Sequence, residues 1–235
     1  TAVLPSLSRQ AAADDWPALK ETLGQGIRII FFLTLPAMVG LMILGEPIVA
    51  LLFERGEFDA AATRLTAGAL SYYAAGLWAF ASVRIIAAGY FALQDTRTPL
   101  MAAFVSIGAN LVLGAILMRS MAQNGLALAT AIASMLNLTI LVFGINLKLE
   151  GLPWRRLLPS MLRTVVISCL MGLGVWAIAG VILPVSGPSI FQRATGLIAV
   201  VASGCVIYLG LSWILNSREL AGVLTELKKS KAGHE

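Results

Sequence analysis

The feature that most constrains this chain is a series of six apolar segments, each close to the ~20 residues that a membrane-spanning helix requires. They lie at 29–53, 67–91, 100–118, 126–147, 161–183 and 195–215. Only 12% of the residues are charged, about half the share expected of a soluble domain. The pattern predicts an all-α, polytopic membrane helix bundle with six complete transmembrane helices.

The segments divide the chain into four regions. The first is expected to hold the end of a truncated helix and a cytoplasmic amphipathic linker, because an apolar start without Met is followed by a polar stretch. Four spans follow, then two additional spans, and finally a polar cytoplasmic tail. In order, the regions are 1–28, 29–147, 148–218 and 219–235.

Two prolines fall inside the first span. Pro36 is tolerable as a kink if a neighbouring helix satisfies the carbonyl that it frees. Glu46 and Pro47 together interrupt the apolar run. We therefore expect residues 48–53 to be an irregular continuation near the membrane interface.

The basic residues predict the orientation. Of the 17 Lys and Arg residues, twelve lie in the N-terminal stretch, the second and fourth gaps and the tail, and four lie in the remaining gaps. An excess of Lys and Arg marks the cytoplasmic side, so both ends are predicted to be cytoplasmic. Basic residues confined to gaps between apolar runs also argue against a nucleic-acid partner.

Enzyme chemistry is not expected from this sequence. It contains no Walker-type loop, no G-x-S-x-G motif and no paired carboxylates. The single histidine, His234, is in the tail, so neither a metal site nor a cofactor is predicted. Cys169 and Cys205 each fall inside an apolar segment, which favours small packing residues over a disulfide.

Four polar residues within the spans are candidate site residues. Arg84 is the one basic residue well inside a span, where a charge costs at least ~2.5–3.5 kcal/mol. It therefore either faces a polar cavity or extends to the headgroups as an anchor. Tyr73, eleven residues earlier, shares its face on a regular helix. Asn110 and Thr130 lie on the third and fourth spans, where they either bond across helices or line a polar pathway or ion site.

Two ordered motifs, LLFERGEF at 51–58 and GYFALQDTRTP at 89–99, closely resemble the MurJ/MviN family, the lipid II flippases of the MOP exporter superfamily. The likeness is strong over 1–150 and weaker over 151–235. It implies fourteen helices in two lobes around a central cavity. By this resemblance the chain is the second lobe plus two extra C-terminal helices, and the N-terminal lobe of the same protein is missing.

The resemblance also implies a function, a location and partners. The expected function is transport of lipid II, a lipid-linked peptidoglycan precursor, across the inner (cytoplasmic) membrane by alternating access. Arg84 stands where the family carries a basic residue, and the helices at 161–183 and 195–215 would border a groove for the polyprenyl tail. Two alternatives are a MOP exporter of another lipid-linked oligosaccharide or of drugs, and a non-transporting scaffold for cell-wall assembly.

Some family members bind sodium through an Asn and an acidic residue on one helix and a Thr on the next. Asn110 and Thr130 match that description, but Gly114 stands where the acidic residue belongs. The missing carboxylate argues against a sodium site of that design. Coupling of transport to sodium or to the membrane potential is nevertheless kept as an alternative.

Overall fold

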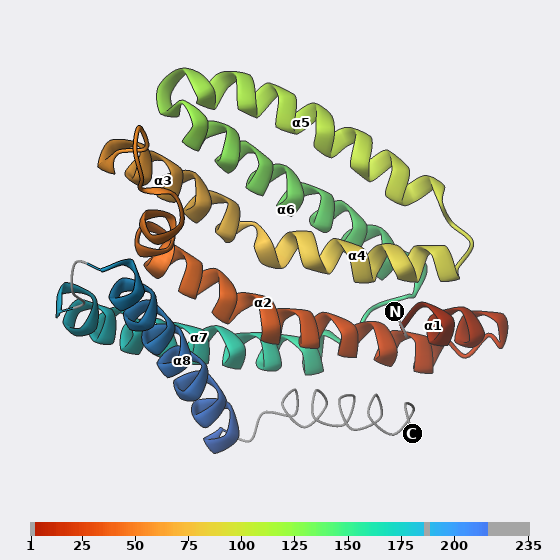
Figure 1. Ribbon diagram of the computed structural model, residues 1–235. Coiled ribbons are helices and arrows are strands. Elements are labelled where there is room, and N and C mark those ends of the chain that lie inside the picture. The colour runs from red at the N-terminus through yellow and green to blue at the C-terminus, as the bar shows by residue number, and fades with distance from the viewer. Residues whose placement is uncertain (1–2, 186–188, 216–235) are drawn as a thin grey trace.

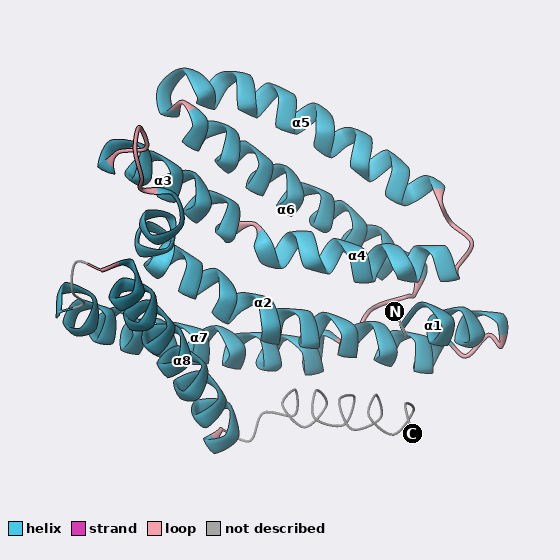
Figure 2. Ribbon diagram, in the orientation of Figure 1, coloured by secondary structure: helices cyan, strands magenta, loops and turns pink. Residues whose placement is uncertain are grey.

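The computed structural model describes residues 3–185 and 189–215, and within these ranges the chain is helical apart from short connections (Figures 1 and 2). The eight helices of this part are α1 (Val3–Ala12), α2 (Trp16–Phe53), α3 (Ala60–Ala75), α4 (Leu77–Ala92), α5 (Arg97–Met121), α6 (Gln123–Lys148), α7 (Trp154–Val185) and α8 (Ile190–Ile214).

Six stretches of these helices are long and apolar enough to cross a membrane, which confirms the prediction of six spans. Helices α3 and α4 together form one of them, Ala60–Ala92. The α4–α5 turn and the α6–α7 connection lie at the end of the bundle that carries α1, and the α2–α3 and α5–α6 connections lie at the opposite end (Figure 1). Successive spans therefore run in alternating directions.

Helix α2 is the central element of the fold. Its 38 residues extend about 57 Å. It is capped by Asp15, whose side chain accepts a hydrogen bond from the Ala18 amide at 3.1 Å. It continues through the predicted boundary at residue 28 and through Pro47 to Phe53, so the expectation of irregular backbone at 48–53 is wrong. A proline removes a single helical hydrogen bond, and the bonds on either side maintain the helix.

Two hydrophobic cores meet along α2. The first joins the N-terminal half of α2 to α1, α4, α6 and the start of α7, and it includes Leu23 and Tyr90. The second joins the C-terminal half of α2 to α7 and α8, and it includes Leu44, Ile167 and Val200. The two C-terminal helices are therefore attached to the remainder of the bundle mainly through α2.

The carbonyl freed by Pro36 has a partner on another helix. Proline lacks an amide hydrogen, so Pro36 leaves the carbonyl of Phe32, four residues earlier, without its usual helical donor. The hydroxyl of Tyr208 on α8 donates to this carbonyl at 2.6 Å, and the two aromatic rings lie 5.1 Å apart. In a lipid environment, the carbonyl that a proline frees within a span requires such a hydrogen-bond donor from another helix.

The outer faces of the bundle are strongly apolar. Helix α5 packs chiefly on α6, and its Met101, Phe104 and Leu111 are 62–70% exposed. A contiguous apolar surface of this kind marks a membrane or partner interface. Cys169 and Cys205 are unbridged but lie exposed on α7 and α8, so the prediction that they are packed inside the bundle is wrong. Both lie on outward faces of their helices. In an apolar segment the composition is the same on the outward and inward faces, so it does not show which face a residue occupies.

Replacing Tyr208 by Phe is expected to lower the free energy of unfolding of the detergent-solubilised full-length protein by about 1–2 kcal/mol, because a buried carbonyl loses its donor. Tyr90→Phe is the matched control. The Tyr90 hydroxyl donates to the Leu141 carbonyl at 3.0 Å, but Leu141 lies in an unbroken helix and keeps its amide donor. Thermal unfolding should show the larger loss for Tyr208→Phe.

The same loss should shrink when Pro36→Ala restores the helical amide donor to the Phe32 carbonyl. An equal effect of Tyr208→Phe with and without Pro36→Ala would contradict the assigned role of this hydroxyl.

Candidate functional site

Arg84 lies on the face of α4 that the described helices leave open. The opposite face of α4, which includes Ser82 and Tyr90, is buried against α2 and α6. Arg84 is exposed, as are Phe80 and Phe91, which share its face at spacings of four and seven residues. Within residues 3–185 and 189–215, the Arg84 guanidinium makes no hydrogen bond or ion pair. A charge on an otherwise apolar face is therefore available to a ligand or to a further part of the protein.

Tyr73 is also exposed, at 43%, but it belongs to a different helix. Helix α3 ends at Ala75 and α4 begins at Leu77, with Gly76 between them. A Cβ atom at Gly76 would lie 2.9 Å from the Cα atom of Ala131 on α6, so only glycine allows this close approach. Because of the break, the spacing argument that placed Tyr73 on the face of Arg84 does not carry across Gly76.

Asn110 and Thr130 face each other across the α5–α6 interface. The Thr130 hydroxyl lies 3.4 Å from the Asn110 side-chain oxygen and 2.9 Å from the Leu126 carbonyl. A hydroxyl carries one proton, and the shorter contact is the better hydrogen bond. The structure thus brings these two predicted residues together, in a region separate from Arg84.

The turn between α4 and α5 is held by Asp95. Its carboxylate accepts hydrogen bonds from the Thr98 amide at 3.0 Å and the Thr98 hydroxyl at 2.6 Å, and it pairs with Lys148 at the end of α6. The Lys148 and Thr98 hydrogen bonds hold the pKa of the Asp95 carboxyl well below its usual range. The Lys148 ammonium also lies 5.7 Å from the centre of the Tyr90 ring. The turn at Asp95, which belongs to the motif GYFALQDTRTP, therefore fixes α4 and α5 to the end of α6.

A second polar contact at the same end joins α6 to α7. The Asn146 side-chain oxygen accepts from the Leu152 amide at 2.9 Å and from the Trp154 indole at 2.8 Å. Sequence reasoning missed Asn146. The sequence signal that could have identified it is an amide side chain near the end of a span, followed closely by a turn and a tryptophan.

Comparison with known proteins agrees with this arrangement. The model of the family described as "Lipid II flippase MurJ" matches residues 1–192. The chain belongs to this family.

Relatives within the family are moderately similar over almost the whole chain. A "Probable lipid II flippase MurJ" from Vibrio cholerae serotype O1 is 32% identical over 219 residues, which are 93% of this chain and 42% of the relative. One from Rhizobium meliloti is 30% identical over 234 residues, 97% of this chain and 43% of the relative. A solved structure described as "Lipid II flippase MurJ, inward closed conformation" superposes with a TM-score of 0.73 at 25% identity.

That superposition covers 92% of this chain and 42% of the solved one. The chain therefore spans less than half the length of the curated relatives that it matches.

Asn110 and Thr130 do not fit the sodium site that the resemblance implied. A Cβ atom at Gly114 would point at the Leu126 side chain, 3.3 Å away, and lie 4.0 Å from Ala129. Gly114 itself contributes no side-chain oxygen, and a hard cation needs such oxygen ligands. Within the described part of the chain there is also no cluster of three His, Cys, Asp or Glu residues suited to a metal.

An apolar cavity lies where the resemblance placed a groove for a lipid tail. It has a volume of about 290 Å³ and is formed by α2, α7 and α8, with Leu51, Leu183 and Leu197 among its lining residues. Arg193 also lines it, near the start of α8. The cavity combines a largely apolar lining with one positive charge.

Asp95→Asn is expected to lower the free energy of unfolding by about 1 kcal/mol, since the partly exposed Lys148 loses its partner. The folded-state pKa of Asp95 lies well below the ordinary value of an aspartate. The stabilisation is therefore complete above about pH 4 and is lost as the pH falls through the folded pKa. Unfolding temperatures should be measured for both proteins from pH 3 to 7. At pH 5–7 the wild type should unfold at a higher temperature than the variant, by an amount that does not change with pH.

Asp14→Asn is the control, since the Asp14 carboxylate accepts no hydrogen bond from the described residues. Equal unfolding temperatures for Asp95→Asn and the wild type at pH 7 would contradict the role given to this pair.

Proposed function

We propose that the full-length protein containing this chain transports lipid II across the inner membrane by alternating access. Family membership over residues 1–192 supports this proposal, and the open face around Arg84 is the observation that carries it. The process moves a lipid-linked diphosphate and makes or breaks no covalent bond. The protein is therefore a transporter rather than an enzyme.

Arg84 is the residue to which we assign the diphosphate. It lies eight residues before the end of α4, roughly 12 Å along the helix. A guanidinium at that depth is costly unless it faces water or an anionic partner. Its planar group forms paired, charge-assisted hydrogen bonds with phosphate oxygens. Arg84 thus supplies an anion-binding group on a face that the described helices do not cover.

The proposed orientation places both ends of the protein in the cytoplasm. The end of the bundle with α1, the α4–α5 turn and the α6–α7 connection (Figure 1) carries the gaps that are rich in Lys and Arg, as expected of a cytoplasmic side. The tail, with four further basic residues, lies outside the described residues. An inner-membrane location follows from the family.

The rest of the proposed cavity would come from an N-terminal lobe, which the additional length of the relatives would supply. Rocking of two lobes about a fixed site is the usual route to alternating access in transporters. The lipid tail would remain in the bilayer beside α7 and α8, next to the cavity that contains Arg193. No step is assigned to a cation at Asn110 and Thr130.

Arg84→Ala in the full-length protein is expected to reduce the rate of lipid II transport at least tenfold, because two or more charge-assisted hydrogen bonds disappear. Cells that depend on the variant should accumulate lipid II that an externally added lipid II-cleaving enzyme cannot reach. Arg97→Ala is the matched control, because Arg97 is exposed at the start of α5 and bonds to none of the described residues. It should transport normally.

Arg84→Lys separates an anion site from a membrane anchor. Lysine extends to the headgroups as well as arginine does, but it lacks the planar fork. A site predicts partial loss with lysine and complete loss with alanine. Normal transport by a membrane-inserted Arg84→Ala protein would overturn the assignment of the diphosphate to Arg84 and would leave Arg84 as a membrane anchor.

A further inference from the structure

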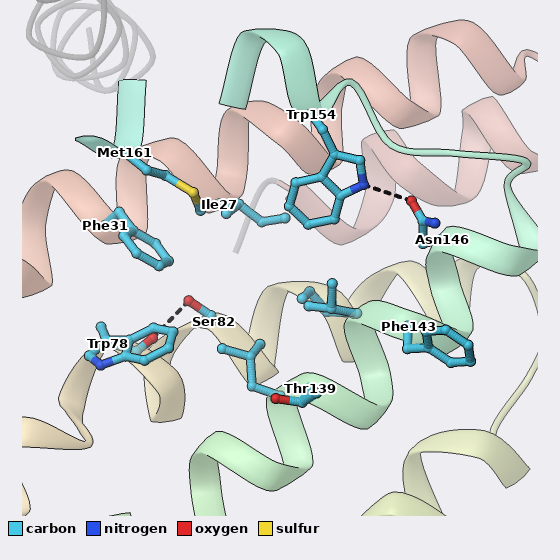
Figure 3. Close-up of a pocket in the computed structure, with 12 residues that line it drawn as sticks. Ile27, Phe31, Trp78, Ser82, Thr139, Phe143, Asn146, Trp154 and Met161 are labelled. Carbon is cyan, nitrogen blue, oxygen red and sulfur yellow. Dashed lines mark hydrogen bonds between the residues drawn. The ribbon is translucent and has the colours of Figure 1, made fainter. Parts of the chain in front are cut away.

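A separate cavity of about 400 Å³ lies between α2, α4, α6 and α7 (Figure 3). Its walls are largely aromatic and aliphatic, with Phe31 from α2, Trp78 from α4, Phe143 from α6 and Trp154 and Met161 from α7. Trp78 and Ser82 place it on the buried side of α4, roughly opposite Arg84. The proposed transport site therefore does not include this crevice.

The hydroxyl groups in the crevice are already used within their own helices. The Ser82 hydroxyl donates to the Trp78 carbonyl at 2.7 Å, and the Thr139 hydroxyl donates to the Met135 carbonyl at 2.8 Å. Neither is free to donate a hydrogen bond to a ligand. The middle of the crevice is thus suited to an alkyl chain rather than to a polar molecule.

One end of the crevice offers hydrogen-bond donors. The Asn146 oxygen accepts from the Leu152 amide and the Trp154 indole, and these two donors fix which way the side-chain amide points. The Asn146 nitrogen is therefore left with two hydrogens, and in the described part of the chain it donates to no acceptor. Because the α6–α7 connection is at this end, the donors lie near the membrane surface.

The crevice is accessible from the outer surface of the bundle. Phe143, one of its lining residues, is 65% exposed. The neighbouring outward side chains are apolar as well: Leu147 on α6 is 64% exposed, and Leu158 and Leu162 on α7 are 58% and 66% exposed. On a membrane protein such a surface meets lipid tails, so the entrance is open to the bilayer.

A basic residue follows the tryptophan at this end. Arg155 is exposed and forms no ion pair or hydrogen bond with any residue of the described ranges. Its neighbour Arg156 is different, because it pairs with Glu21 at 3.1 Å. Arg155 thus carries an uncompensated charge and directly follows Trp154, whose indole donates to Asn146.

We propose that this crevice binds a glycerophospholipid with an anionic headgroup, taken from the surrounding bilayer. One acyl chain occupies the apolar interior between Phe31, Trp78 and Phe143. The ester carbonyl accepts a hydrogen bond from the Asn146 nitrogen, and the phosphate pairs with Arg155. A neutral lipid would leave Arg155 unpaired, and a water-soluble anion would leave the apolar interior unfilled, so charge and shape together select this class.

The test uses the full-length protein purified in a mild detergent with equal amounts of phosphatidylglycerol and phosphatidylcholine. Native mass spectrometry counts the lipids retained by each variant. Arg155→Glu should reduce phosphatidylglycerol retention about tenfold, because a charge-assisted hydrogen bond becomes a repulsion. Arg97→Glu, at the same end of the bundle, should leave retention unchanged.

A second variant tests the acyl chain separately from the headgroup. Thr139 is exposed at the rim of the crevice, so Thr139→Trp fills the crevice without changing any charge, and Thr139→Ser is its control. The proposal predicts a comparable loss of phosphatidylglycerol for Thr139→Trp and none for Thr139→Ser.

Three results would overturn the proposal. Unchanged retention with Arg155→Glu removes the headgroup contact, and unchanged retention with Thr139→Trp shows that no chain enters the crevice. Displacement of the bound phosphatidylglycerol by one equivalent of lipid II assigns the crevice to the polyprenyl tail of the substrate.

Discussion

The structure depends on one requirement of the membrane interior, that every backbone carbonyl within a span finds a donor. Helix α2 contains two prolines and still runs unbroken from Trp16 to Phe53. At Pro36 the lost amide bond is replaced by the Tyr208 hydroxyl, which reaches the Phe32 carbonyl from α8. The bond that repairs α2 also attaches the last described helix to the bundle. Because α2 takes part in both hydrophobic cores, its continuity positions the first four spans relative to the last two.

Helix α4 separates two surfaces with different chemistry. Its buried face packs on α2 and α6, and an apolar crevice with the amide of Asn146 at one end lies along that side. Its opposite face presents Arg84 between exposed phenylalanines. The motif that follows α4 anchors the end of the helix, because Asp95 pairs with Lys148 and Lys148 lies over the Tyr90 ring. A charge on an anchored helix is suited to bind an anion in a defined place.

Much of the fold could be predicted from the sequence, because hydropathy over ~20 residues directly reports the lipid environment. The six spans and the cap at Asp15 follow from local signals. The donor that Pro36 requires could be expected but not identified, because Tyr208 is 176 residues away from Phe32. The irregular backbone expected at 48–53 was wrong, because Pro47 removes only one helical hydrogen bond. The outward positions of Cys169 and Cys205 were missed for a related reason: in lipid, apolar residues occupy both the inner and the outer faces of a helix.

The candidate site was predictable only in part. Arg84 stands out because a charge in a span is rare, but its exposure depends on which helices cover α4. Tyr73 was placed by assuming a regular helix, but the helix breaks at Gly76, where the backbone closely approaches Ala131. Asn110 and Thr130 do meet, and they lack the acidic partner because residue 114 is a glycine. The Asp95–Lys148 pair spans 53 residues, so neither residue alone indicates it.

The central claim is that the face of Arg84 borders water in the assembled protein, whereas the outer face of α5 borders lipid. Single cysteines at position 84 and at Leu111, 70% exposed on α5, test it in a full-length protein whose other cysteines are replaced by serine. A charged, membrane-impermeant thiol reagent should modify Arg84→Cys readily and Leu111→Cys hardly at all. Equal, low reactivity at both positions would contradict the claim and would leave Arg84 as a membrane anchor.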